Sequence, residues 1–362
     1  MNERSNKNCP KDEFVQREVA QFWGWLVIPL IAVVAALLLP AIKLKSKPVV
    51  ILYCAQDQEY AEPLLKQFEQ ETGIRVKALY DNEAVKTVGL ANRLLAERNH
   101  PLCDVFWGNE ELRTRQLAAQ NVFRETNGWT AFGYRSRRIV INTNLVAFAE
   151  PTPNPSQEGS NDGARTNASS LPGRGQGWVA PRSLLDLTNA IWRDKVALAY
   201  PQFGTTGTHM NALRQLWGEA RWLAWCRGLV ANGTKLVDGN SVVVKLVGRG
   251  EAAIGLSDSD DILAGQREGL PVAMLPLGPE SLLIPNTVGV IRGAPHAAAA
   301  EKLRQFLQRR DVVEKLVAAH ALESVESPVD RAARDGLLQP DWPVILRDLD
   351  TTTKQLNEEF LK

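Results

Sequence analysis

Cysteine and histidine are scarce in this chain of 362 residues, which contains four of each. No two cysteines form a CxxC pair, and the histidines are scattered without the spacing of a metal-binding motif. This pattern excludes a zinc finger and a fold built on disulfides. Cys54, Cys103 and Cys226 fall in the main body of the chain, and this odd number does not identify a redox compartment.

The chain also lacks an excess of either charge, with 42 Lys+Arg against 41 Asp+Glu and a formal net charge of +1. Binding of nucleic acid through bulk charge needs a concentrated basic face, so we expect no nucleic-acid partner. The sequence has no GxxxxGK[ST], HExxH or GxSxG motif, and no strand pattern precedes the glycines Gly173, Gly175 and Gly177. We therefore predict a protein that is not an enzyme and has no cofactor.

One long apolar run is present near the amino terminus. Residues 22–42 carry no charge, follow a polar tail of residues 1–21, and as a helix would span about 30 Å, the thickness of a hydrocarbon core. Trp23 and Trp25 at one end and Lys43 at the other are typical of membrane interfaces. Because no small-x-small cleavage site ends the run, the sequence predicts an uncleaved transmembrane helix, with a signal sequence as the alternative.

The rest of the chain alternates short β-branched runs with amphipathic helical patterns. The first series has strand patterns at 48–53, 74–79 and 104–107 and helical patterns at 60–72 and 83–98. The second has strand patterns at 195–199, 235–237, 252–256 and 272–275 and helical patterns at 208–230, 241–247 and 262–268. Such alternation predicts an α/β protein with two lobes, each a mixed, mostly parallel sheet flanked by helices.

Residues 151–177 separate the two series. They consist mostly of Pro, Gly, Ser and Asn and hold too few apolar side chains to form a core of their own. We expect a mobile surface insert.

Three polar clusters follow strand patterns, where an open α/β sheet presents its ligand-binding groups. Residues 55–60 include Asp57, which is placed either to cap the next helix or to contact a ligand. Residues 204–209 join glycines and threonines at a helix entry, which suits a carboxylate-like group or serves as a plain helix start. Residues 257–261 carry three carboxylates in four positions, which favours either a cation or amine site or a solvated helix cap.

Six segments resemble sequences of a known protein family. They read YCAQDQEYAEPLLKQFEQETGIRVKALYD, NEAVKTVGLANRLLAE, CDVFWGNE, VALAYPQFGTTGTH, NSVVVKLVGRGEAAIGLSDSDD and IPNTVGVIRGAPH. From residue 48 to at least residue 316, the chain resembles the extracellular solute-binding proteins of iron(III)-type ABC importers. The resemblance implies the two-lobed type II periplasmic-binding-protein fold, with ligand bound between lobes that close about a hinge.

The resemblance also implies a domain organisation. Residues 48–140 plus 280–362 would form lobe 1, and residues 141–279 would form lobe 2, which carries the insert. Residues 129–142 and 286–292 match the two strands that cross the hinge.

The expectation that the ligand is iron comes only from this resemblance. Relatives that bind iron through tyrosinate carry an adjacent Tyr-Tyr pair after the strand that matches residues 252–256, whereas this chain has Ser259 and Asp260 there. Carboxylates bind Fe(III), but they also suit many other cations. Asp258 and Asp260 are therefore the expected metal ligands, and the metal is left open.

We predict a membrane-tethered substrate-binding protein on the extracytoplasmic face that acts as a monomer with ABC permease and ATPase subunits. Its ligand would be ferric iron or a complexed or anionic solute, and the alternative is an anchored sensor of the same fold without a transport role. Arg135 and Arg137 are placed either to bind an anion or to lie solvated on a strand. The expected ligand-binding residues are Asp57, Glu59, Asn109, Glu110, Arg135, Thr205, Thr206, Thr208, Asn240, Ser241, Asp258 and Asp260.

Overall fold

The computed structural model describes residues 47–80, 86–125, 128–147 and 178–361. The predicted membrane segment, residues 22–42, and the predicted insert, residues 151–177, lie outside these described residues. No helix within the described ranges is both long and apolar enough to cross a membrane. Pro48–Lys362 forms one compact unit, and the description below concerns this unit by itself.

The first βα series folds as the sequence predicts. Strands β1 (Val49–Cys54), β2 (Arg75–Tyr80) and β3 (Val105–Gly108) pair in parallel in the order β2-β1-β3. Helices α2 (Gln58–Thr72), α3 (Lys86–Glu97) and α4 (Glu111–Ala119) follow these strands. Helix α2 ends at Gly73, whose left-handed φ of 70° suits a residue without a Cβ atom.

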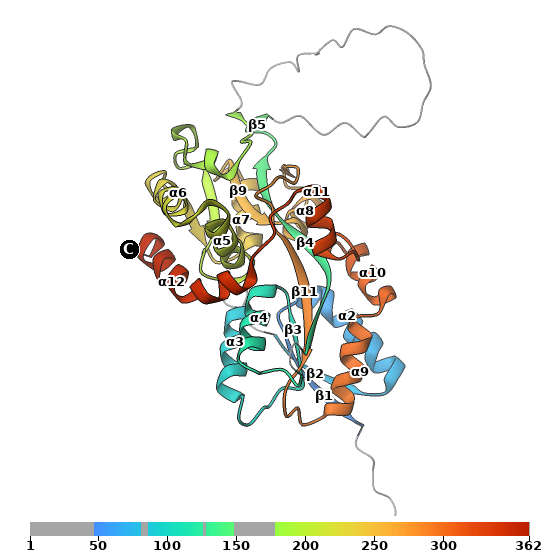
Figure 1. The fold of residues 1–362 in the computed structure, drawn as a ribbon. Helices are drawn as coiled ribbons and strands as arrows, with labels where there is room; N and C mark the ends of the chain where they lie inside the picture. Colours follow the sequence, from blue (N-terminus) through green and yellow to red (C-terminus); the bar gives the residue numbers. More distant parts are fainter. Residues whose placement is uncertain (1–46, 81–85, 126–127, 148–177, 362) are drawn as a thin grey trace, which may run out of the picture. The chain divides into compact units, whose positions relative to one another are not determined.

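Two long strands connect this series to the second one. Strand β4 (Trp129–Asn142) pairs antiparallel with β11 (Leu283–Val290) along its first half and with β9 (Ile254–Asp258) along its second half. Helices α3, α4 and α9 (Ala297–Leu307) lie around one end of these strands and helices of the second series around the other (Figure 1). The predicted crossing strand 129–142 has these bounds in the structure.

A register shift interrupts the pairing of β4 with β11. Ile284 pairs with Arg135, but Asn286 pairs with Phe132, so β4 carries one extra residue at this point. Gly133 lies in the shift with a φ of 54°, as expected for a β-bulge that contains a left-handed glycine. A Cβ atom there would lie 2.6 Å from Leu322 Cδ1, so the position accepts only glycine without a shift of its neighbours.

The second series completes the sheet. Strands β7 (Val196–Ala199) and β8 (Lys235–Val237) continue from β9 in parallel, and β10 (Val272–Met274) pairs with the end of β4. The whole sheet has the strand order β2-β1-β3-β11-β4-β9-β7-β8, with β10 beside β4. The short strands β5 (Val146–Ala147) and β6 (Trp178–Val179) form a separate pair.

The helices of the second series begin close to the polar clusters. They are α5 (Gly204–Trp217), α6 (Glu219–Ala231), α7 (Asn240–Gly248) and α8 (Ser259–Arg267). Helix α5 begins four residues earlier than predicted, and Gly218, with a φ of 77°, divides the predicted helical stretch 208–230 into α5 and α6. Strand β9 and helix α8 are also displaced from their predicted bounds, so that Asp258 is the last residue of the strand and occupies the N-cap position of the helix.

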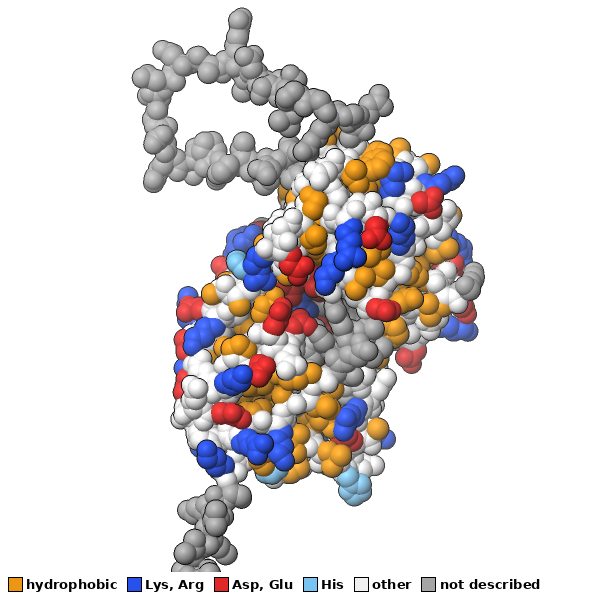
Figure 2. All heavy atoms as spheres, turned by 180° about the vertical axis from the view of Figure 1, so that it is seen from behind, with side chains coloured by type: hydrophobic (Ala, Val, Ile, Leu, Met, Phe, Trp, Pro, Cys, Tyr) orange, Lys and Arg blue, Asp and Glu red, His pale blue; other side chains and the backbone are white. Residues whose placement is uncertain are grey.

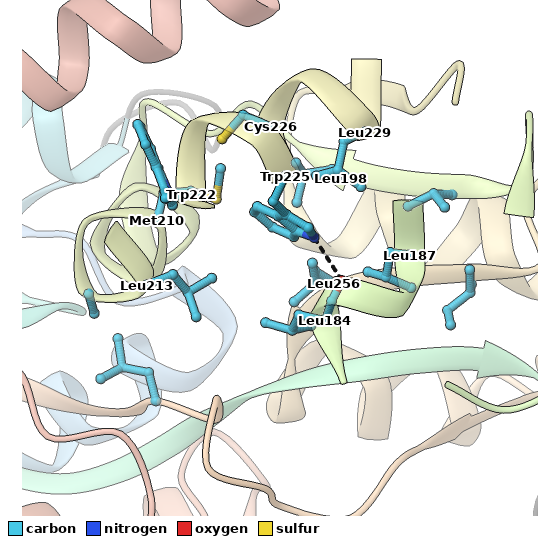
Figure 3. Close-up of a cluster of buried hydrophobic side chains, with 14 of the residues drawn as sticks. Leu184, Leu187, Leu198, Met210, Leu213, Trp222, Trp225, Cys226, Leu229 and Leu256 are labelled. Atoms are coloured by element: carbon cyan, nitrogen blue, oxygen red, sulfur yellow. Dashed lines mark hydrogen bonds between the residues drawn. The ribbon is translucent and has the colours of Figure 1, made fainter. Parts of the chain in front are cut away.

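A tryptophan-rich core holds α5 and α6 in place (Figure 3). Trp225 packs beside Leu213 and Leu256, and its indole Nε1 donates a hydrogen bond of 2.7 Å to the carbonyl oxygen of Leu184. Leu184 belongs to a 3₁₀ turn (Leu184–Thr188), which a second turn (Ala190–Trp192) follows. The start of α5, which contributes to the site described below, therefore rests on a rigid base.

The carboxyl-terminal helices are α10 (Arg310–Ala318), α11 (Pro328–Asp335) and α12 (Trp342–Phe360). The lobe boundaries stay a prediction, and helix α12 packs against helices α5 and α6 of the second series. Its residues Ile345, Leu349 and Leu356 join the core of α5 and α6, because they form one apolar face along the helix. Helix α12 also contacts α4, so it touches elements of both series.

Candidate ligand-binding site

The polar clusters converge on one cavity at the ends of several strands. We call it the acidic cavity; its volume is about 70 Å³, and Figure 2 shows acidic side chains gathered in the hollow across the middle of one face. The described residues that line it are Asp57, Asn109, Arg135, Ala199, Tyr200, Phe203, Gly204, Thr205, Thr206, Asp238, Gly239, Asn240, Asp258, Asp260 and Asp261. A cavity of this size takes a small ligand.

Asp258 is the centre of the hydrogen-bond network around the acidic cavity. Its Oδ1 accepts from Arg137 Nη1 at 2.8 Å, and its Oδ2 accepts from Arg135 Nε at 3.2 Å. Thr205 Oγ1 and Asn240 Nδ2 donate to the same Oδ2 at 2.7 and 3.1 Å. One buried carboxylate thus receives hydrogen bonds from two guanidinium groups, a hydroxyl and an amide.

The charges of this network compensate one another. Burial alone would raise the pKa of Asp258, but Arg137 and Arg135 outweigh it and hold the pKa below its ordinary value. Both arginines are almost fully buried, with side chains 3% and 0% exposed for Arg135 and Arg137. The alternative that they lie solvated on a strand is therefore wrong, because β4 pairs with β9 and sets Arg137 opposite Asp258.

Asp260 and Asp261 add negative charge that the arginines do not balance. Carboxylate oxygens of Asp258, Asp260 and Asp261 all lie within 4.8 Å of one another. Burial raises the pKa of Asp260 to about 7, with Asp258 and Asp57 adding to the shift and Arg135 opposing it. Burial, together with Asp260, raises the pKa of Asp261 well above its ordinary value.

One oxygen of Asp260 has no hydrogen-bond partner among the described residues. Its Oδ2 lies 3.6 Å from Arg135 Nε, but its Oδ1 is buried and unpartnered there, on a side chain that is 7% exposed. A buried carboxylate oxygen without a donor is costly, so it marks a place where a ligand would stabilise the protein.

The helix-capping alternatives do not account for the acidic residues. Asp57 and Asp258 occupy the cap positions of α2 and α8, but neither side chain makes a capping hydrogen bond. At the start of α5, the group held at the positive end of the helix is the carboxylate of Asp258, through Thr205. Thr205 at this helix entry thus contacts a carboxylate of the protein itself.

The structure brings most of the predicted residues together. Those that line the acidic cavity are Asp57, Asn109, Arg135, Thr205, Thr206, Asn240, Asp258 and Asp260. Glu59 and Ser241 line an adjoining cavity of about 270 Å³, which shares Asp57, Asp260 and Asp261 with the first.

Glu110 and Thr208 line neither cavity. Thr208 Oγ1 donates to Glu110 Oε2 at 2.8 Å, and the same carboxylate caps α4 by accepting from the backbone N–H of Arg113. Burial raises the pKa of Glu110 while Arg113 opposes this shift. These two residues therefore join α4 to α5 and are placed to support the site from outside it.

Sequence reasoning missed four polar or aromatic side chains of the cavity: Tyr200, Phe203, Asp238 and Asp261. Tyr200 and Phe203 follow β7, and Asp238 follows β8. The rule that ligand groups follow strand ends would have found all three, had it been applied to every strand. Asp261 belongs to the predicted cluster at residues 257–261, but only Asp258 and Asp260 of that cluster were predicted as ligand-binding residues.

The family of the chain follows from a comparison with family models. The model described as bacterial extracellular solute-binding protein matches residues 50–319. The chain belongs to this family. The resemblance seen in the sequence is thereby confirmed, and so is the expectation of a non-enzyme, because members of the family bind solutes without converting them.

Solved structures of similar fold include iron-bound HitA from Pseudomonas aeruginosa, with a TM-score of 0.67, 17% identity, and 86% of this chain and 99% of that chain covered. A ferric binding protein from Campylobacter jejuni has a TM-score of 0.64 and 16% identity, with 86% of this chain and 99% of that chain covered. AfuA from Actinobacillus pleuropneumoniae, with fructose-6-phosphate bound, has a TM-score of 0.67 and 16% identity, with 87% of this chain and 99% of that chain covered. At these identities the comparisons establish the type II periplasmic-binding fold and not the ligand.

The family gives the general role. This bacterial extracellular solute-binding protein is the ligand-binding component of an ABC importer, which works with permease and ATPase components. Such a component is extracytoplasmic or periplasmic.

Proposed function

We propose that this protein captures a small metal cation in the acidic cavity and delivers it to its ABC permease. The observation that carries the proposal is the group of three aspartates whose oxygens lie within 4.8 Å of one another, one of them with a buried, unpartnered oxygen. A cation bound there would supply the missing partner of Asp260 Oδ1 and offset the repulsion among the carboxylates.

The charge count around the cavity supports a cation over an anion. Four carboxylates, those of Asp57, Asp258, Asp260 and Asp261, face the guanidinium groups of Arg135 and Arg137. Both arginines donate hydrogen bonds to Asp258, so at the acidic cavity their charge balances that carboxylate. The carboxylates thus outnumber the guanidinium groups by four to two.

The donor set favours a hard cation. Carboxylate, hydroxyl and amide oxygens line the cavity, and such ligands suit Mg²⁺, Ca²⁺, Mn²⁺ or Fe(III). Ferric iron stays within the proposal, supported by the fold shared with iron-bound HitA and by the phenol of Tyr200 at the cavity wall.

Calorimetric titration of the full-length protein in detergent with MnCl₂, CaCl₂ and ferric citrate tests the proposal. We expect one of them to bind and to raise the unfolding temperature, by the equivalent of about 2.7 kcal/mol at a hundredfold excess over its dissociation constant. Asp260→Asn should abolish this binding, whereas Asp350→Asn, at an exposed position of α12, should leave it unchanged. Binding that survives Asp260→Asn would contradict the proposal.

We further propose that residues 22–42 tether the protein to the membrane as an uncleaved helix. The support is the length of the uncharged run and its flanking tryptophans and lysines. After alkaline washing, the full-length protein should stay with the membrane fraction and a variant without residues 22–42 should be released. Release of both would contradict the tether.

A further inference from the structure

A second cavity borders Arg137. Its volume is about 510 Å³, and we call it the leucine-lined cavity after Leu184, Leu256, Leu275 and Leu277 in its wall. The size and the largely apolar lining are those of sites for small organic ligands. The two cavities share no lining residue.

Arg137 is only partly satisfied by the acidic cavity. Its Nη1 donates to Asp258 Oδ1 and to Asn240 Oδ1, at 2.8 and 2.9 Å. Its Nε and Nη2 are buried and have no hydrogen-bond partner among the residues that the structure describes. Buried N–H groups of a charged side chain are rarely left unpaired, because each costs about 1–3 kcal/mol.

Two further arginines lie in the wall of the leucine-lined cavity. Arg138 pairs with Glu323 at 3.4 Å, Arg182 is exposed, and the lining holds one carboxylate, that of Glu280. Glu280 is occupied by Ser183 Oγ and the backbone N–H of Leu184, at 2.8 and 2.6 Å. His209 also lines this cavity, and its Nε2 lies 2.7 Å from the carbonyl oxygen of Glu280. Its imidazole adds no charge, because burial lowers its pKa to about 3.

The apolar wall of the cavity is rigid. Leu184 and Leu256 belong to the core beneath Trp225, and Figure 3 shows them beside each other there. A preformed wall of this kind binds an apolar group without a large loss of conformational entropy.

We propose that the leucine-lined cavity binds an organic anion, whose carboxylate or phosphate group meets Arg137 and whose apolar body lies against the leucines. Guanidinium groups bind both oxyanions through paired N–H donors, and Arg137 has two such donors on adjacent nitrogens. Arg182 would add long-range attraction at an exposed position of the lining. This site is separate from the cation site and does not depend on it.

Calorimetric titration of the full-length protein with benzoate and with phenyl phosphate tests the site and distinguishes the two head groups. We expect at least one of them to bind, and benzamide, which has the same ring without the charge, to bind at least about tenfold more weakly. In a protein with four histidines, the side-chain NMR signal of His209 should move during the titration.

Two variants and a matched control locate the binding. Gly278→Leu should weaken it about tenfold or more by filling the cavity, since a Cβ atom at Gly278 meets nothing within 4 Å and the fold is left intact. Arg182→Ala should weaken it by up to about fivefold, and Arg193→Ala, an exposed arginine outside the lining, should not.

Three results would overturn the inference. Benzoate and phenyl phosphate could bind no better than benzamide, the signal of His209 could stay in place, or Asp260→Asn rather than Gly278→Leu could abolish binding, which would move the anion to the acidic cavity. Loss of cation binding in Asp260→Asn with anion binding retained supports two independent sites.

Discussion

The acidic cavity and the leucine-lined cavity treat the same guanidinium group in opposite ways. Toward the acidic cavity, Arg137 binds Asp258 and Asn240 through one nitrogen. Its other two nitrogens have no partner among the described residues, although the side chain is fully buried. Burial by itself therefore does not distinguish a structural charge from a functional one. What distinguishes the two is which hydrogen-bonding atoms of the side chain have a partner.

Asp258→Asn should break this arrangement with the largest effect. The change removes the carboxylate shared by two buried arginines, so we expect the free energy of unfolding to fall by about 3–5 kcal/mol. Urea denaturation measures this loss as a lower midpoint. Asp350→Asn serves as the surface control and should change the free energy by less than about 0.5 kcal/mol. Equal, small losses in both variants would show that the ion pairs do not stabilise the fold.

Asp260 should give the acidic cavity a characteristic pH dependence in the absence of ligand. Its pKa is about 7 in the folded protein against an ordinary value of 3.8, so between these limits the folded state holds a proton that the unfolded state has released. The contribution of Asp260 to the free energy of unfolding therefore falls as the pH rises, by up to about 1.4 kcal/mol per pH unit. Asp260→Asn should make this slope shallower in denaturation curves measured at several pH values.

His209 should give the opposite slope beside the leucine-lined cavity. Burial lowers its pKa to about 3 from 6.5, so between these values the unfolded state binds a proton that the folded state does not. Its contribution to the free energy of unfolding is complete above pH 6.5 and is lost as the pH falls. His209→Gln, measured with Asp260→Asn, should change the pH dependence in the opposite direction. Two variants with parallel curves would contradict the comparison.

The smallest expected effect separates binding from stability. Arg182 is exposed, so Arg182→Ala should change the free energy of unfolding by less than about 0.5 kcal/mol while benzoate affinity falls. A thermal melt without ligand and a titration with ligand measure the two quantities. A large loss of stability would instead make Arg182 part of the fold.

The sequence allowed most of the acidic cavity to be predicted, because strand ends are visible in the hydrophobic pattern. Asp57 and Asp260 each follow a buried strand, and the carboxyl ends of neighbouring strands meet at one place. The partners of individual side chains were not visible in the same way. Asp258 lies 121 residues after Arg137, and no local pattern relates the two. The same holds for Thr208 and Glu110, 98 residues apart, whose mutual hydrogen bond places them outside the cavity.

The extra residue at Gly133 has a consequence for how β4 tolerates change. Side chains alternate between the two faces of a strand, and one additional residue inverts that alternation for everything that follows. Arg135 shares a face with Phe132 only because of this insertion. Deletion of Gly133 would force one half of the strand to slide by a residue and would turn either the arginines or the preceding side chains to the wrong face. This part of β4 is thus more sensitive to an insertion or deletion than to most substitutions. Homologous chains should keep the number of residues here even where the amino acids differ.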